Sequence, residues 1–122
     1  MPMVLIVDDD NDFREHVRTL FDHGGGFNAC VEARNGADAL DKTKQLSPDL
    51  AVLDFSLQDM EVLELAQRLK ALIPKLPIFV MTTDYNVNLE KKALASGIIA
   101  VFSKLDDLAT LVANARAVCG IE

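Results

Sequence analysis

Short, continuous apolar runs constrain the fold of this chain more than any other feature of its sequence. Four of them contain no polar residue, which predicts strands buried on both faces, as in a parallel sheet. These runs are Val4–Val7, Leu50–Leu53, Ile78–Met81 and Ile98–Phe102. A further candidate strand, Phe27–Glu32, is weaker because it contains Asn28. Strands that need cover on both faces predict a sheet between two layers of helices.

Helical segments follow each of these runs. Apolar residues recur at helical spacing in Asn11–His23 and Val62–Leu72, and Asp12 with Glu15 fits a capping box at the start of the first. Asp10 is interpreted as a cap or rim charge. The other predicted helices are Ala37–Leu46, Asn88–Ser96 and a last segment from about Leu108. Five βα units predict a flavodoxin-like α/β fold, a doubly wound five-stranded parallel sheet of order 2-1-3-4-5, as one domain over residues 1–122.

The charge balance narrows the function classes. The chain has 19 acidic against 12 basic side chains, for a net charge of −7, and no cluster of Lys and Arg. This composition argues against direct nucleic-acid binding by the domain. No apolar stretch approaches the roughly 20 residues of a membrane span, and the N-terminus lacks a secretory pattern. We therefore expect a cytoplasmic protein without membrane association.

Polar side chains follow four of the predicted strands at their carboxyl ends. They are Asp8, Asp9 and Asp10 after the first apolar run, Asp54 after Leu53, Thr82 after Met81, and Lys104 shortly after Phe102. In the predicted strand order the first and third strands are neighbours at a switch point, where such folds bind ligands. Grouped carboxylates suit a hard cation such as Mg²⁺, and a carboxylate can also attack phosphorus. The sequence therefore predicts a site for a divalent cation and a phosphoryl group.

The chain resembles the receiver domain of two-component response regulators over nearly its whole length. The resemblance rests on the segments VLIVDDD, ARNGADALDKTKQLSPDLAVLDFSLQDM, LPIFVMTT and ASGIIAVFSK, and on their spacing. It implies that Asp54 is the phosphoacceptor and that Asp8 and Asp9 hold Mg²⁺. Asp9 would be a direct ligand, and Asp8 would act partly through water.

The resemblance also implies roles for three further residues and for partners. Ser56 would offer its backbone carbonyl to the metal, Thr82 rather than Thr83 would hydrogen-bond the phosphoryl group, and Lys104 would pair with it. A histidine kinase or histidine phosphotransfer protein would be the donor. A downstream effector protein or fused effector domain would receive the signal, and a homodimer is possible. Such a domain catalyses only its own phosphorylation and dephosphorylation, so no enzyme acting on an external substrate is expected.

Four positions depart from the family pattern. Gln58 and Val62 stand where the family usually has Pro and Gly, in the segment after the phosphoacceptor. Leu105 follows Lys104 in place of a cis proline, and a trans bond is expected because a non-proline cis bond costs about 3 kcal/mol. Val101 stands where a switching Tyr or Phe is frequent, so the coupled aromatic movement should be absent or muted.

Two other functions remain compatible with parts of the pattern. A phosphatase of the haloacid dehalogenase type has an Asp-x-Asp after its first strand, as in Asp8 and Asp10, with a later Thr and Lys. That family needs more chain than is present, and it leaves Asp54 without a role. A receiver-like interaction module that never uses phosphate is the second alternative, and the departures at Gln58 and Val62 favour it.

Overall fold

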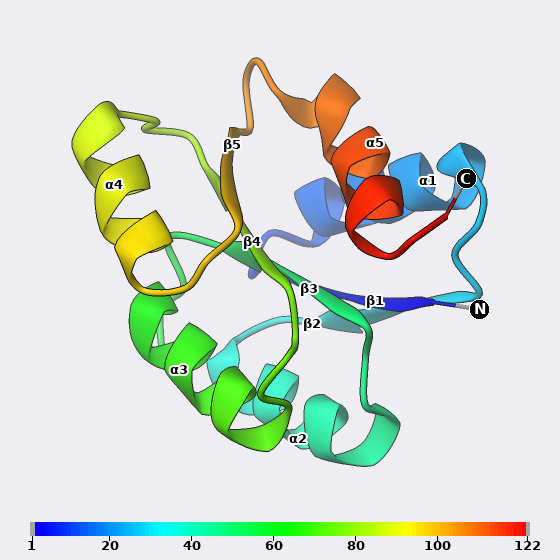
Figure 1. The fold of residues 1–122 in the computed structure, drawn as a ribbon, viewed down its shortest axis with the longest axis horizontal. Coiled ribbons are helices and arrows are strands. Elements are labelled where there is room, and N and C mark those ends of the chain that lie inside the picture. The colour runs from blue at the N-terminus through cyan, green and yellow to red at the C-terminus, as the bar shows by residue number, and fades with distance from the viewer. Residues whose placement is uncertain (1, 122) are drawn as a thin grey trace.

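A five-stranded parallel sheet forms the centre of the computed structural model, which describes residues 2–121 (Figure 1). The strands are β1 (Met3–Val7), β2 (Ala29–Ala33), β3 (Leu50–Asp54), β4 (Ile78–Thr82) and β5 (Ala100–Ser103). The helices are α1 (Asn11–Gly24), α2 (Gly36–Leu46), α3 (Val62–Leu72), α4 (Val87–Ala95) and α5 (Leu108–Val118). The strand order is β2-β1-β3-β4-β5, which confirms the predicted fold class. Within residues 2–121 no helix is long and apolar enough to cross a lipid bilayer.

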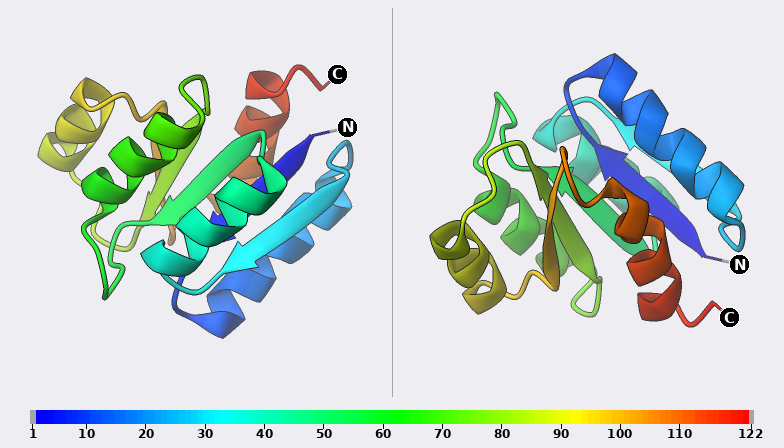
Figure 2. Two further views of the ribbon diagram at one scale, coloured as in Figure 1. Left: turned by 90° about the horizontal axis from the view of Figure 1, so that it is seen from below. Right: turned by 90° about the horizontal axis from the view of Figure 1, so that it is seen from above.

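Each inner strand is buried on both faces, as its unbroken apolar sequence predicts. Leu5 and Val7 pack in one core layer, with the apolar residues of α2, α3 and α4. Val4 and Ile6 point to the opposite face, where they pack with α1 and α5. The two views of Figure 2 show these helical layers on either side of the sheet. Full burial of one such Val, Leu or Ile side chain stabilises the fold by about 1.5–3 kcal/mol.

Two predicted strands have different limits in the structure. β2 begins at Ala29 rather than Phe27, because Phe27 turns its ring against Phe21 at 4.9 Å between centroids, nearly perpendicular to it. β5 begins at Ala100 rather than Ile98, because the backbone N–H of Ile98 donates to the carbonyl of Ala93 at the end of α4. Ile98 is buried, but it packs as part of the α4–β5 connection. A short apolar run alone cannot separate a strand residue from a buried loop residue.

The start of α1 also differs from the predicted capping box. Asp10 is the N-cap, and its side chain accepts hydrogen bonds from the backbone N–H groups of Asp12 and Phe13. The pairing of Asp12 with Glu15 as a capping box is therefore wrong, whereas the interpretation of Asp10 as a cap is confirmed. The cap satisfies two N–H groups that the helix itself leaves free.

An aspartate in the β3–α3 loop holds that loop against the start of α2. The Asp59 carboxylate accepts hydrogen bonds from the backbone N–H groups of Gly36 at 2.9 Å and Ala37 at 3.0 Å. A Cβ added at Gly36 would lie 3.1 to 3.3 Å from Met60, so the next loop residue packs tightly on the same turn. The loop with Gln58 in place of the family's Pro is thus attached to the first turn of α2 through Asp59.

Removing this attachment should destabilise the protein in a pH-dependent way. The N–H of Gly36 and, after it, that of Ala37 lower the pKa of Asp59, against an opposing effect of burial. A lowered folded-state pKa gives stability that is present above the ordinary aspartate pKa of about 4 and is lost as the pH falls through the folded value. We expect Asp59→Ala to lower the free energy of unfolding by about 0.5–1 kcal/mol at pH 7, as for other lost helix caps. Urea denaturation from pH 7 down to pH 3.5 measures the difference, which should shrink toward acid.

Asp41→Ala is the matched control, because it removes an exposed aspartate from the middle of the same helix. It should not reproduce the loss of stability. A deficit of Asp59→Ala that is equally large at every pH would contradict the role of the carboxylate.

Candidate functional site: an acidic cluster with a buried lysine

Three carboxylates converge at the carboxyl ends of β1 and β3. The two strands pair in parallel with Val7 opposite Leu53, so the next residue of each, Asp8 and Asp54, leaves the sheet at the same edge. One carboxylate oxygen from each of Asp8, Asp9 and Asp54 lies within 4.8 Å of the others. Asp8 is fully buried and Asp54 is 5% exposed, whereas Asp9 is open to solvent. The structure therefore brings together three residues that the sequence assigned to one site.

Lys104 reaches into this cluster from the end of β5. Its ammonium Nζ lies 2.8 Å from Asp8 Oδ2 and 3.1 Å from Asp54 Oδ1. The side chain is only 12% exposed. Its backbone N–H donates to the carbonyl of Thr82 at 2.8 Å, which fixes where the side chain leaves the sheet. A buried ammonium and buried carboxylates each offset part of the desolvation cost of the other, so removal of one partner leaves an uncompensated buried charge.

The environment shifts the protonation of the pair. Burial raises the pKa of Asp8, and so does the neighbouring charge of Asp54, while the hydrogen bonds from Lys104 and from the N–H of Asp10 oppose the rise. Burial alone would lower the pKa of Lys104, but the hydrogen bond to Asp8 and the charges of Asp8 and Asp54 outweigh it and raise that pKa. Lys104 is therefore a firmly charged ammonium at neutral pH.

The donor set suits a hard divalent cation. The cluster contains three carboxylates, and within residues 2–121 Lys104 is the one ammonium that contacts them. Two negative charges are therefore left without a compensating positive charge. Burial of such charges is unfavourable, as the raised pKa of Asp8 indicates. Oxygen ligands and excess negative charge are what Mg²⁺ requires, and the exposure of Asp9 leaves one side open to metal-bound water. The residues present therefore fit Mg²⁺.

Of the two remaining predicted residues, Thr82 lies on the strand that pairs with that of Asp54, and Ser56 lies two residues after Asp54 in the chain. Thr82 is the last residue of β4 and is 2% exposed, and Asp54 pairs with the residue before it, Met81. The Thr82 hydroxyl accepts a hydrogen bond from the N–H of Asp84. Thr83 is exposed, so burial favours Thr82 as the residue facing the site. Ser56 is exposed and lies in the turn after β3.

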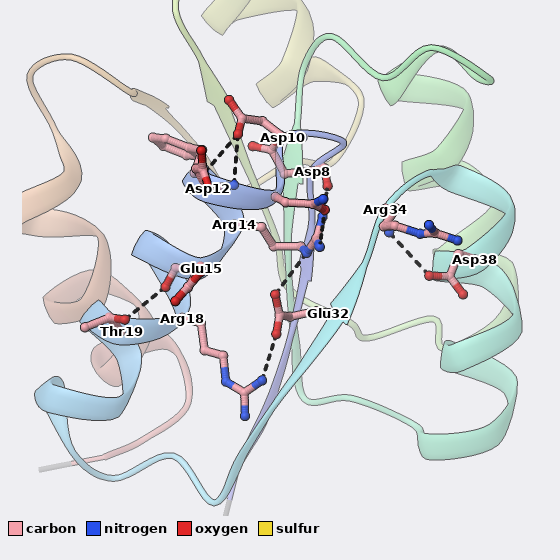
Figure 3. A network of polar contacts seen from close by, with 12 residues as sticks. Asp8, Asp10, Asp12, Arg14, Glu15, Arg18, Thr19, Glu32, Arg34 and Asp38 are labelled. Carbon is pink, nitrogen blue, oxygen red and sulfur yellow. Dashed lines mark hydrogen bonds and ion pairs between the residues drawn. The ribbon is translucent and has the colours of Figure 1, made fainter.

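A buried arginine braces the backbone of the cluster from α1. The Arg14 guanidinium donates to the carbonyl oxygen of Asp8 at 2.6 Å and to Asn11 Oδ1 at 2.6 Å. Its Nε donates to Glu32 on β2, and Glu32 also pairs with Arg18 (Figure 3). Although burial opposes it, the hydrogen bonds from Arg18 and Arg14 hold the pKa of Glu32 below its usual value. This network ties α1, β1 and β2 together directly behind Asp8.

The loop that carries Lys104 is held by two polar residues. The Ser103 hydroxyl accepts hydrogen bonds from the N–H groups of Leu105 and Asp106, and Asp107 Oδ2 accepts one from the N–H of Ser103. No cis peptide bond occurs in the described residues, so the expected trans bond between Lys104 and Leu105 is confirmed. Ser103 and Asp107 thus fix the turn at a place where the family normally has proline.

Sequence reasoning missed the roles of several residues around the cluster. Phe13 is one of the apolar residues of the helix predicted over Asn11–His23, and no sequence pattern relates it to Lys104, whose Nζ lies 4.2 Å from the centroid of the Phe13 ring. No role was predicted from sequence for Arg14 or for Asp59, although Asp59 lies within a segment that carries the family resemblance. The one local signal available is Ser103 at the end of an apolar run, because a Ser hydroxyl often bonds the backbone N–H groups of the residues that follow it.

The structure weighs against the phosphatase alternative. That interpretation requires Asp10 as a partner of Asp8 in the reaction, but the Asp10 side chain caps α1 through two backbone N–H groups. Asp54, which the alternative leaves unused, is instead in contact with Lys104.

Comparison with known proteins identifies relatives of the chain. The family model of the response regulator receiver domain matches residues 4–116. A putative transcriptional regulator of Pseudomonas aeruginosa is 38% identical over 97% of this chain, and the virulence regulator BvgA of Bordetella pertussis is 32% identical over 94%. The chain spans 56% and 54% of these two relatives, about half their length.

Solved structures agree on the fold. A two-component response regulator of the LuxR family from Aurantimonas superimposes with a TM-score of 0.90 at 23% identity, over 98% of this chain and 86% of that one. A CheY-like receiver domain from Methanospirillum hungatei gives 0.86 at 22% identity, over 98% and 94%. The match of the family model over most of the chain establishes the family as well as the fold. The chain belongs to the response regulator receiver domains of two-component systems.

Proposed function

We propose that Asp54 accepts a phosphoryl group from a phosphohistidine of a sensor kinase or phosphotransfer protein. The observation that carries this proposal is the contact of the Asp54 carboxylate with both Lys104 and the acidic cluster. In the transfer, an Asp54 oxygen forms a bond to phosphorus, the bond from phosphorus to the imidazole nitrogen breaks, and the imidazole takes up the electron pair. Water later attacks the same phosphorus, the bond from phosphorus to the Asp54 oxygen breaks, and inorganic phosphate leaves the restored carboxylate.

The surrounding residues supply position and charge, which is most of what phosphoryl transfer requires. Asp8, Asp9 and Asp54, with the Ser56 carbonyl, would hold Mg²⁺, which neutralises charge on the phosphoryl oxygens when bound. Lys104 stays charged at neutral pH and pairs with one of these oxygens. The buried Thr82 hydroxyl donates a hydrogen bond to another. The chain acts on no external substrate in this proposal, because the group remains on Asp54 until water removes it.

The phosphorylated form would act through a changed partner surface in the cytoplasm. The chain's curated relatives named above are transcriptional regulators about twice as long, which supports a fused or separate effector as the recipient of the signal. Val101 is buried in β5 and has no ring to swing between two positions. We therefore place the change in the loops after Asp54 and Thr82, either within one chain or across a homodimer.

Asp54 should be the sole phosphoacceptor. After incubation with acetyl phosphate and Mg²⁺, the intact mass of the wild type should rise by one phosphoryl group, whereas Asp54→Asn should gain none, because an amide cannot form the acyl phosphate. Asp41→Asn, in an exposed aspartate of α2, is the control and should gain mass as the wild type does. Mass gain in Asp54→Asn would move the site to Asp8 or Asp9. No gain in the wild type would favour a phosphate-independent interaction module.

Mg²⁺ should stabilise the fold through the acidic cluster. Binding to the folded state alone adds RT ln(1 + [L]/Kd), about 1–2 kcal/mol when the metal exceeds its Kd about fivefold to thirtyfold. A thermal melt with and without millimolar Mg²⁺ measures the shift, which Asp9→Asn should abolish. Asp12→Asn, an exposed aspartate in the first turn of α1, should keep it. Equal shifts in Asp9→Asn and the wild type would place the metal elsewhere.

A further inference from the structure

An aromatic ring covers the lysine of the site. The Phe13 ring centroid lies 4.2 Å from Lys104 Nζ, within the range of a cation–π contact. The ammonium also contacts Asp8 at 2.8 Å and Asp54 at 3.1 Å. Two sides of the ammonium thus face carboxylates, and a further side faces the ring. These contacts account for its exposure of only 12%.

The first turn of α1 fixes the position of this ring. The Asp10 side chain accepts from the N–H of Phe13 at 3.1 Å, and the Asp10 carbonyl accepts from the N–H of Arg14. Arg14 in turn holds the Asp8 carbonyl. Phe13 is half-buried and packs against the core layer beneath α1 and α5. The helix cap and the core thus hold Phe13 in place, and its ring contacts Lys104.

A ring in this position changes what the ammonium can do. An ammonium has three N–H donors, and one that finds no protein partner normally binds water. The face of a benzene ring attracts a cation without forming the directional bonds that water offers. Beside Phe13 the Lys104 ammonium therefore stays close to the carboxylates, and its interactions act at lower local dielectric than in water.

We propose that Phe13 is a positioning residue for Lys104, which shields the ammonium from water and keeps it beside the Asp54 carboxylate that accepts the phosphoryl group. The inference rests on the proposed phosphoryl transfer and adds a specific residue to it. Phe13 touches no reacting atom, and its effect passes entirely through Lys104. Preorganised charge of this kind lowers the barrier because it needs no rearrangement as charge develops in the transition state.

Rates of phosphorylation with acetyl phosphate and Mg²⁺, followed by intact mass, test the reaction. Phe13→Leu keeps an apolar side chain but removes the ring, and we expect it to be phosphorylated about threefold to tenfold more slowly, as the strength of a cation–π contact predicts. Phe13→Tyr retains the ring and should stay within about twofold of the wild type. Phe27→Leu is the matched control, because it removes another half-buried ring from the same core layer, and it should also stay near the wild-type rate.

A spectroscopic measurement without any phosphoryl donor tests the contact itself. In ¹H–¹⁵N NMR spectra of the lysine ammonium groups, Lys104 should give a signal shifted upfield by the ring current and sharpened by slow exchange with water. Phe13→Leu should lose the ring shift and broaden the signal, whereas Phe13→Tyr should retain both. Where Phe13→Leu lowers the melting temperature, Phe13→Met serves as a second ring-free variant.

The outcomes separate the two proposals. A wild type that gains mass, together with a ring-free variant that gains it equally fast, overturns the positioning role and leaves phosphorylation of Asp54 intact. A ring-free variant whose Lys104 signal is unchanged overturns the role in the same way. A wild type that gains no mass overturns the proposed function, and the role of Phe13 in phosphoryl transfer with it. A slow Phe13→Leu beside normal Phe13→Tyr and Phe27→Leu supports the proposal.

Discussion

The ion pairs of Lys104 with Asp8 and Asp54 are the interaction on which the site depends. Buried carboxylates are unfavourable without a partner, and removing one partner of such a group typically costs about 3–5 kcal/mol. The three residues lie at the carboxyl ends of β1, β3 and β5, and they meet only because parallel strands end at one edge of the sheet. The order of the strands is thus a requirement of the site as well as of the core. The same contacts keep Lys104 charged, because its two carboxylates outweigh the effect of burial on its pKa.

Around this centre, the chain stabilises its loops with polar side chains where the family more often uses proline and glycine. Asp59 attaches the loop after Asp54 to the first turn of α2. Ser103 and Asp107 hold the turn after β5 through side chain to backbone hydrogen bonds. A carboxylate cap can be protonated or released, whereas a proline restricts the backbone permanently. Because backbone N–H groups lower the pKa of Asp59, we expect the loop after Asp54 to loosen in acid, as a loop restricted by proline would not.

The fold was predictable from sequence because strands that are buried on both faces consist of continuous apolar residues, which are easily recognised. The strand order, the third helix and the convergence of Asp8, Asp9 and Asp54 all follow from those runs and from the residues that end them. Two strand limits were wrong because Phe27 and Ile98 are apolar for reasons of loop packing. The contact of Phe13 with Lys104 joins residues 91 positions apart in the chain, and its geometry depends on how α1 and β5 lie in space. Local sequence patterns therefore cannot predict this contact.

A crystal structure with Mg²⁺ and beryllofluoride, a stable mimic of the phosphoryl group, tests the central claim most directly. We expect the mimic on the Asp54 carboxylate, with Lys104 Nζ and the Thr82 hydroxyl in contact with its fluorines. The metal should be bound by Asp9, Asp54 and the Ser56 carbonyl, with Asp8 close by. A mimic bound to another carboxylate, or Lys104 still paired only with Asp8 and Asp54 beside a fully occupied adduct, would contradict the account.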